Sequence, residues 1–163
     1  MLEPYDYAQK ATSDTPKIQP ELIQALALNN ILRGALTAVD SYTQVIEKVK
    51  DDPESVRLTK FKQFHEDLVS YWELRVGSKN IEPAESPGVW GFVVTAFVGV
   101  AKILGSESAL SALIMGEEHG LNEYKRLLEN KFTSSEDKKF IRDTIIPRLD
   151  SHIASIEAMK KNN

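Results

Sequence analysis

Three polar residues, His65, Glu117 and His152, occupy positions at which the surrounding pattern predicts apolar side chains. Each lies on a different stretch of chain with helical periodicity, at a comparable height along that stretch. Imidazole and carboxylate groups hydrogen-bond to one another, and both are ligands of divalent transition metals. Because a buried glutamate without a partner is costly, Glu117 is expected to contact a histidine N–H or a metal ion.

Two interpretations of this group remain open. In the first, which the sequence favours, a buried His–Glu–His cluster fixes the register of the helices through hydrogen bonds, and no cofactor is expected. In the second, His65, Glu117 and His152 hold a single iron, zinc or manganese ion with open positions for water or substrate. Asp40 or Glu118 could then add an oxygen ligand.

A standard two-metal carboxylate centre matches the sequence poorly. Such bundles take one Glu from each of two helices and a Glu-x-x-His pair from each of the other two. The residue three before His65 is Lys62, and the residue three before His152 is Leu149, so both pairs lack their glutamate. Lys62 also adds a positive charge where a dication would lie.

The chain that must position these residues begins with the periodicity of long helices. Pro20 suits a first helical position, and apolar residues then recur at spacings of four and three up to about residue 50. Asp52-Pro53 predicts the N-cap and first turn of a second helix that ends near Gly77. The residues predicted to face inward are Leu28, Leu32, Ala35, Val39, Tyr42, Ile46, Val49, Leu58, Phe61, His65, Leu68 and Trp72.

The second half of the chain continues the helical pattern with two interruptions. A segment that starts at Ser86-Pro87 is punctuated near Gly105 and then continues as a helix. Ser134 and Asp137 resemble a capping box for the last helix, and Pro147 is expected to kink that helix rather than end it. The predicted inward residues are Leu110, Leu113, Glu117, Leu121, Tyr124, Leu128, Ile141, Ile145, Leu149, His152, Ile156 and Met159.

Four long amphipathic segments joined by short or moderate loops predict an all-α protein. The economical architecture is an up-down four-helix bundle whose third helix is long or broken near Gly105. The bundle is expected to occupy residues 20–161 as one domain. Residues 1–19 are polar and show no apolar period, so they are expected to form a flexible N-terminal arm.

Composition argues against several functional classes. Without cysteine, the chain has no disulfides, thiolate metal sites or cysteine nucleophiles. A net charge of −4 argues against a general nucleic-acid binder, and neither a glycine-rich phosphate loop nor a G-x-S-x-G elbow is present. The first residues do not resemble a signal peptide, and no run of about 18 uncharged apolar residues predicts a membrane span. A cytoplasmic protein is therefore expected.

The most hydrophobic part of the chain, Val89–Ala101, is uncharged and apolar on every side. Its β-branched content also suits a buried strand, so periodicity alone leaves helix and strand open. A helix that is apolar all round needs cover on every side, which favours a homodimer formed through this segment. A third hypothesis uses the same face to bind a different protein.

A family resemblance is carried by four segments: LNNILRGALTAVDSYTQVIEKV, FHEDLVSYWELRVGS, LSALIMGEEHGLNEYKRLLEN and IIPRLDSHIASIE. They are similar to successive helices of an uncharacterised bacterial family of ferritin-like four-helix proteins, a domain of unknown function. The resemblance covers roughly residues 20–158, and its most specific pieces are Arg33-Gly34, the Gly116-Glu117-Glu118 turn with Tyr124 after it, and the two histidines. It implies a ferritin-like bundle.

The resemblance also bears on the metal ligands. Family members often carry a glutamate directly after the Arg-Gly pair, where this chain has Ala35, and Asp40 stands where a second acid is common. The loss at position 35 counts further against a two-metal centre. The favoured expectation is a non-catalytic structural or interaction protein, stress-related by family analogy. The alternative is a metal-handling or oxidase-type protein that uses His65, Glu117 and His152.

Overall fold

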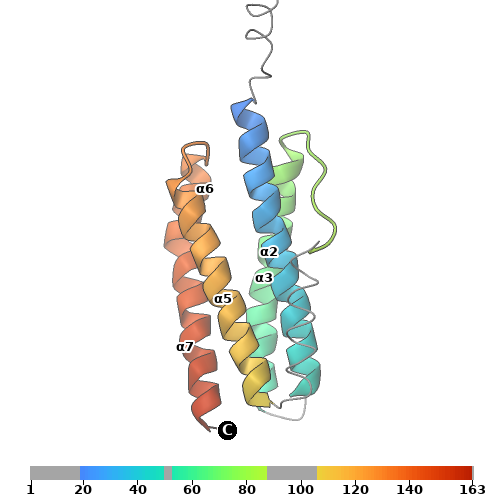
Figure 1. Cartoon of the computed structure of the whole chain (residues 1–163), viewed down its shortest axis with the longest axis vertical. Helices are drawn as coiled ribbons and strands as arrows, with labels where there is room; N and C mark the ends of the chain where they lie inside the picture. Colours follow the sequence, from blue (N-terminus) through green and yellow to red (C-terminus); the bar gives the residue numbers. More distant parts are fainter. Residues whose placement is uncertain (1–18, 50–52, 88–105, 163) are drawn as a thin grey trace, which may run out of the picture.

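The computed structural model describes residues 19–49, 53–87 and 106–162, and every regular element within these ranges is helical (Figure 1). The prediction of an all-α protein is thus confirmed for the described part of the chain. The elements are α2 (Pro20–Lys48), α3 (Glu54–Gly77), α5 (Ser106–Glu129), α6 (Ser135–Phe140), the π-helical turn η1 (Ile141–Ile145) and α7 (Ile146–Asn162). The last three follow one another without a break and act as one long helix.

Two apolar cores lie at opposite ends of the helical assembly. We name them after a central residue of each, the Trp72 core and the Leu58 core. The Trp72 core is formed by Leu28, Ile31, Leu32, Ala35, Leu68, Trp72, Val76, Ala84, Leu121, Tyr124, Leu127, Ile141, Ile145 and Leu149. The Leu58 core is formed by Tyr42, Val45, Val49, Leu58, Ala109, Leu110, Leu113, Ile156 and Met159. All four long helical segments contribute to both.

The order in which each helix visits the two cores gives its direction. The helix α2 and the η1–α7 helix enter at the Trp72 core and leave at the Leu58 core, whereas α3 and α5 run the opposite way (Figure 1). Because α3 and α5 share a direction, the described helices do not follow the strict up-down alternation expected from the sequence. The chain leaves α3 at one end of the assembly and enters α5 at the other.

The described part of this connection, residues 78–87, is held against α2. Asn29 is buried in α2, where its side-chain oxygen accepts the backbone N–H of Ala84 at 2.8 Å and its amide donates to the carbonyl of Glu82 at 3.4 Å. Ala84 is itself part of the Trp72 core, and Ile81 packs against this core. A polar side chain on the first helix thus fixes the start of the connection.

The inward faces predicted from periodicity are largely the buried ones. Every predicted inward residue is buried except four that are half-buried, which are Val39, Ile46, Phe61 and Leu128. At the end of α5, Leu127 is buried in the Trp72 core, and its neighbour Leu128 is partly buried and packs against that core. A helix places its side chains by local geometry, and this is why the pattern could be predicted.

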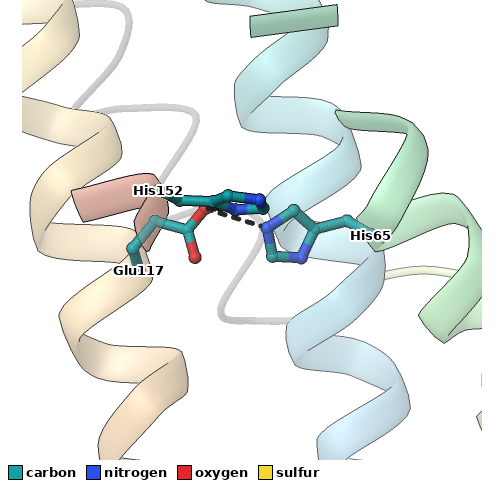
Figure 2. A group of neighbouring side chains, drawn as sticks. All are labelled: His65, Glu117 and His152. Atoms are coloured by element: carbon teal, nitrogen blue, oxygen red, sulfur yellow. Dashed lines mark hydrogen bonds and ion pairs between the residues drawn. The ribbon is translucent and has the colours of Figure 1, made fainter. Parts of the chain in front are cut away.

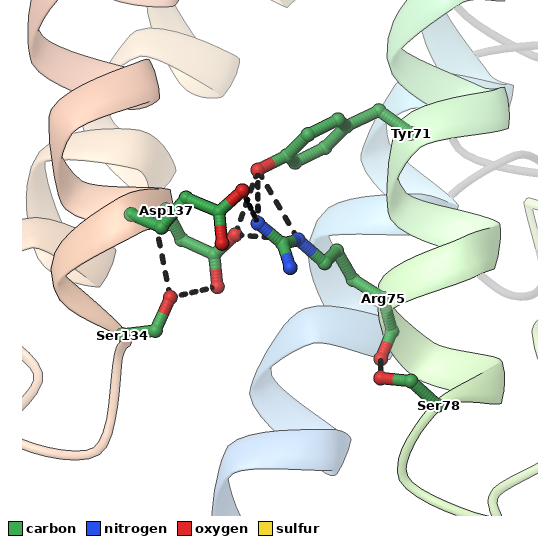
Figure 3. Close-up of polar contacts among 6 residues, drawn as sticks. Tyr71, Arg75, Ser78, Ser134 and Asp137 are labelled. Atoms are coloured by element: carbon green, nitrogen blue, oxygen red, sulfur yellow. Dashed lines mark hydrogen bonds and ion pairs between the residues drawn. The ribbon is translucent and has the colours of Figure 1, made fainter.

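The N-cap half of the predicted capping box is present at the start of α6. Ser134 is the N-cap, and its hydroxyl oxygen accepts the backbone N–H of Asp137 at 3.0 Å. The buried Asp137 carboxylate also accepts the Tyr71 hydroxyl at 2.8 Å and pairs with Arg75 Nε at 2.9 Å (Figure 3). Arg75 reaches Glu136 as well, at 2.7 Å, so the end of α3 is tied to the start of α6.

The last helix continues past Pro147, as predicted, and it accommodates the proline through the π-turn η1 directly before it. In a regular α-helix the proline ring would clash with the carbonyl of Asp143, and a wider turn gives the ring room. The π-turn also suits two successive spacings of four, which keep Ile141, Ile145 and Leu149 all buried.

Several sequence predictions lie outside the described residues. These are residues 1–18 of the expected N-terminal arm, Asp52 as an N-cap, the apolar segment Val89–Ala101 and the interruption at Gly105. Of the second helix's predicted start, Pro53 is described, and it directly precedes the first residue of α3. The homodimer built on Val89–Ala101 therefore stays a prediction.

By length and composition alone, α2 could cross a membrane. Among the helices in the described ranges, it is the one that meets this criterion. Core helices of soluble proteins meet the same criterion. Here, Leu28, Leu32 and Val45 of α2 are buried against the other helices. The expected absence of a membrane span stays a prediction.

Candidate metal centre

The three polar residues on the inward faces meet between the two cores (Figure 2). His65 Nε2 from α3 and His152 Nδ1 from α7 each lie 3.0 Å from the same oxygen, Oε1 of Glu117 on α5. All three side chains are buried. Sequence periodicity placed each on an inward face, and the tertiary structure brings them into contact.

A fourth residue, Tyr42 of α2, belongs to the same group. Its hydroxyl donates a hydrogen bond to Glu117 Oε1, so that one carboxylate oxygen accepts from three different helices. Sequence periodicity predicts Tyr42 only as an inward-facing core residue. The available signal was its polar tip, which α2 presents on its inward face at the level of the other three.

Each member is placed by its neighbours on the helix. On α3, His65 lies between Leu58 and Leu68. On α5, Glu117 lies between Leu113 and Leu121, and one residue of each flanking pair belongs to each core. His152 follows the π-turn, whose extra width keeps the inward face of η1 continuous with that of α7.

Aromatic rings surround the two imidazoles and fix their planes. Phe61 stacks on His152 with ring centroids 4.1 Å apart and an angle of 22°, and Tyr42 stacks on His65 at 5.4 Å and 30°. Phe64 lies edge-on to both histidines, at 5.9 and 5.5 Å. These contacts restrict rotation of the rings and surround Glu117 with apolar material.

The electrostatics of Glu117 reflect two opposed effects. Burial on its own would raise the pKa of this carboxyl, but the positive charge of His65 and the hydrogen bonds from both histidines outweigh burial and lower the pKa of Glu117 to about 2. Burial raises the pKa of Tyr42 far above its ordinary value, and the adjacent Glu117 charge adds to this rise. At neutral pH the group therefore pairs a carboxylate with a neutral phenol.

The residues fit a metal ion in two respects. One nitrogen of each histidine and a Glu117 oxygen all lie within 4.8 Å of one another. Ligands on one Zn²⁺ or similar ion stand roughly 3.0–3.4 Å apart, given metal–ligand distances of about 2.1 Å. The 3.0 Å separations of Glu117 Oε1 from His65 Nε2 and from His152 Nδ1 match this spacing, whereas a pair of ligand atoms at the 4.8 Å limit has to move closer when an ion binds. In addition, Glu117 Oε2 is buried and has no hydrogen-bond partner among the described residues. A buried carboxylate oxygen of this kind is a natural ligand.

The structure does not bring the two further candidate ligands to this group. Asp40 and Glu118 are both exposed. A step of one residue turns a helical side chain by about 100°, so Glu118 points away from the face that Glu117 occupies, and Asp40 is similarly turned from the face of Tyr42. Within the described ranges, His65, Glu117 and His152 are the one group of this kind.

The positions that a two-metal centre would need are occupied by other residues. Ala35 and Leu149 are buried in the Trp72 core, and Lys62 pairs with Glu66 at 3.2 Å along α3. None of these side chains is a carboxylate that could bridge two ions. The described residues thus offer one set of three ligands, suited to one ion.

Comparisons with protein-family models, with curated proteins and with solved structures found no match to this chain. Over residues 19–49, 53–87 and 106–162, fold and site together define an all-α class: four packed helical segments with a buried His–Glu–His group and a tyrosine hydrogen-bonded to it. Function must therefore be argued from the chemistry of this group.

Proposed function

We propose that this chain is a ferritin-like four-helix protein that binds a single divalent transition-metal ion, iron, zinc or manganese, through His65, Glu117 and His152. Two observations carry the proposal: three ligating side chains converge from α3, α5 and α7, and the second oxygen of Glu117, Oε2, is buried with no hydrogen-bond partner among the described residues.

The chemistry of the donors supports this class of ion. Imidazole nitrogen suits zinc and iron, and two histidines with one carboxylate leave coordination positions open for water or another small ligand. A bound ion would supply Lewis acidity or redox chemistry there. The residues of this chain would hold it, and the aromatic rings of Phe61 and Phe64 would limit the access of water.

The helix directions support the ferritin-like part of the proposal. Ferritin-like bundles contain one long crossover connection between their second and third helices. Here α3 and α5 run in the same direction, which requires a connection that starts at one end of the assembly and finishes at the other. The direction of the helices and the resemblance of the sequence thus point to the same class.

A second candidate function is a metal-free structural or interaction protein in which the same group fixes helix register. The observation that favours it is that Glu117 Oε1 already accepts three hydrogen bonds, so the group is held together without an ion. The two candidates differ in whether the purified protein holds stoichiometric metal.

Elemental analysis separates them. We expect protein purified without a histidine tag or chelator, or loaded anaerobically with Fe²⁺, to hold about one ion per chain, and the variants His65→Ala and His152→Ala to lose it. The matched control is His119→Ala, which removes an exposed histidine from the same helix as Glu117 and should retain the ion. Wild-type protein that stays metal-free after loading would establish the second candidate instead.

A further inference from the structure

We infer that Tyr42 is a positioning residue of this centre, whose hydroxyl keeps Glu117 in place when His65 and His152 ligate an ion. The inference rests on the proposed function. It concerns a residue that is not among the three ligands and that comes from α2, the helix that contributes no ligand.

A bound ion would remove two of the polar contacts of Glu117, those with His65 and His152. His65 Nε2 and His152 Nδ1 each lie 3.0 Å from Glu117 Oε1, within hydrogen-bond distance. A nitrogen that ligates a metal has no hydrogen to donate. Both imidazole bonds to Oε1 are therefore lost when the ion binds, and the Tyr42 bond is the one that can persist.

Glu117 has few other contacts that could hold it. Its second oxygen, Oε2, has no hydrogen-bond partner among the described residues. The hydroxyl of Tyr42 is therefore the single polar contact, within the described ranges, that can orient the carboxylate in both states.

Tyr42 itself is rigidly placed. It is buried in the Leu58 core, its ring stacks on His65, and Phe61 packs edge-on against it at 6.4 Å and 81°. The position of its hydroxyl is set by this packing rather than by Glu117. Outer hydrogen-bond partners of metal ligands commonly contribute a factor of roughly 10–100 to metal affinity.

The test compares two conservative variants by titration with Co²⁺, followed through its visible spectrum. Tyr42→Phe keeps the ring and its stacking and removes the hydroxyl. Tyr124→Phe is the control, because it removes an equally buried hydroxyl that accepts from Trp72 Nε1 at 3.0 Å. We expect both variants to lose similar stability without metal, but only Tyr42→Phe to bind Co²⁺ more weakly, by roughly 10–100-fold, and with an altered spectrum.

The outcomes separate the inference from the function on which it rests. If wild-type protein binds no Co²⁺, both are overturned. If wild type and Tyr42→Phe bind with equal affinity and the same spectrum, the ion site stands and the role of Tyr42 is overturned. An Fe³⁺–phenolate absorption band in wild type that is absent from Tyr42→Phe would make Tyr42 a ligand, which also contradicts the inference.

A measurement on the wild-type protein guards against a variant that does not fold. In proton NMR spectra recorded before and after Zn²⁺ loading, the two imidazole N–H resonances bound to Glu117 should disappear, while the Tyr42 hydroxyl resonance should persist downfield. Loss of the hydroxyl resonance together with the other two would overturn the positioning role.

Discussion

Glu117 is a buried carboxylate in contact with two imidazoles and a phenol, and its charge is retained because these partners outweigh the cost of burial. Such a group couples the stability of the fold to pH. It also explains why a glutamate can occupy an inward position between Leu113 and Leu121, where an unpaired carboxylate would destabilise the core.

Acid should remove the stabilisation that Glu117 provides. Its pKa is lowered from 4.5 to about 2 in the folded chain, so the ionised form stabilises the fold above 4.5, and this contribution is lost as the pH falls towards 2. The difference corresponds to on the order of 3 kcal/mol. Urea unfolding of metal-free protein at about pH 6 and about pH 3 should show a steeper loss of stability for wild type than for Glu117→Gln.

The control for this prediction is Glu118→Gln, which changes the exposed neighbour on the same helix and should follow the wild-type profile. Identical pH dependence in wild type and Glu117→Gln would show that the carboxylate has no depressed pKa in the folded protein.

At the scale of elements, the polar contacts between α3 and α6 hold the start of the last helix. Arg75 and Tyr71 lie one turn apart on α3, and both contact the buried Asp137 carboxylate, while the Ser134 hydroxyl donates to its other oxygen at 2.6 Å (Figure 3). The bonds to Glu136 and Tyr71 raise the pKa of Arg75 above its ordinary value, although its partial burial opposes this. These contacts with Asp137 thus fix the start of the continuous helix α6–η1–α7, which carries His152.

Removal of the ion pair between Arg75 and Asp137 should destabilise the protein. Arg75→Ala leaves the buried Asp137 carboxylate without its cation, and we expect a loss of about 2–3 kcal/mol, reduced from the value for fully buried pairs because Arg75 is partly exposed. The control is Arg126→Ala, whose partner Glu123 lies one turn away on the surface of α5, and it should cost less than about 1 kcal/mol. Chemical denaturation measures both, and equal small losses would contradict the prediction.

The helices themselves were largely predictable, but the π-turn and the relative direction of two helices were not. Spacings of three and four identified the inward faces because they depend only on helix geometry. The π-turn before Pro147 was not predicted, because the two successive spacings of four among Ile141, Ile145 and Leu149 also occur at Leu113, Glu117 and Leu121 in the regular helix α5. The shared direction of α3 and α5 could not be derived, because it depends on the path of the connection between them.

At the scale of the whole molecule, the oligomeric state stays a prediction of the sequence. The apolar run Val89–Ala101 predicts a homodimer, so light scattering should give about twice the mass of one chain, and Val94→Glu should shift the protein towards the monomer because it places a charge in an apolar contact. Val56→Glu is the control, since Val56 is already exposed on α3. A wild-type monomer would refute the homodimer.

For the described segments, the sequence by itself determined that they are helical, which faces turn inward, and that His65, Glu117 and His152 lie on those faces, because all three follow from the local 3.6-residue period. Only the tertiary structure decided that Tyr42, His65 and His152 share one oxygen of Glu117, because that depends on the relative register of four helices. It likewise decided that Asp40 and Glu118 stay at the surface. Periodicity fixes the face of a helix, whereas packing of the two cores fixes which residues meet across it.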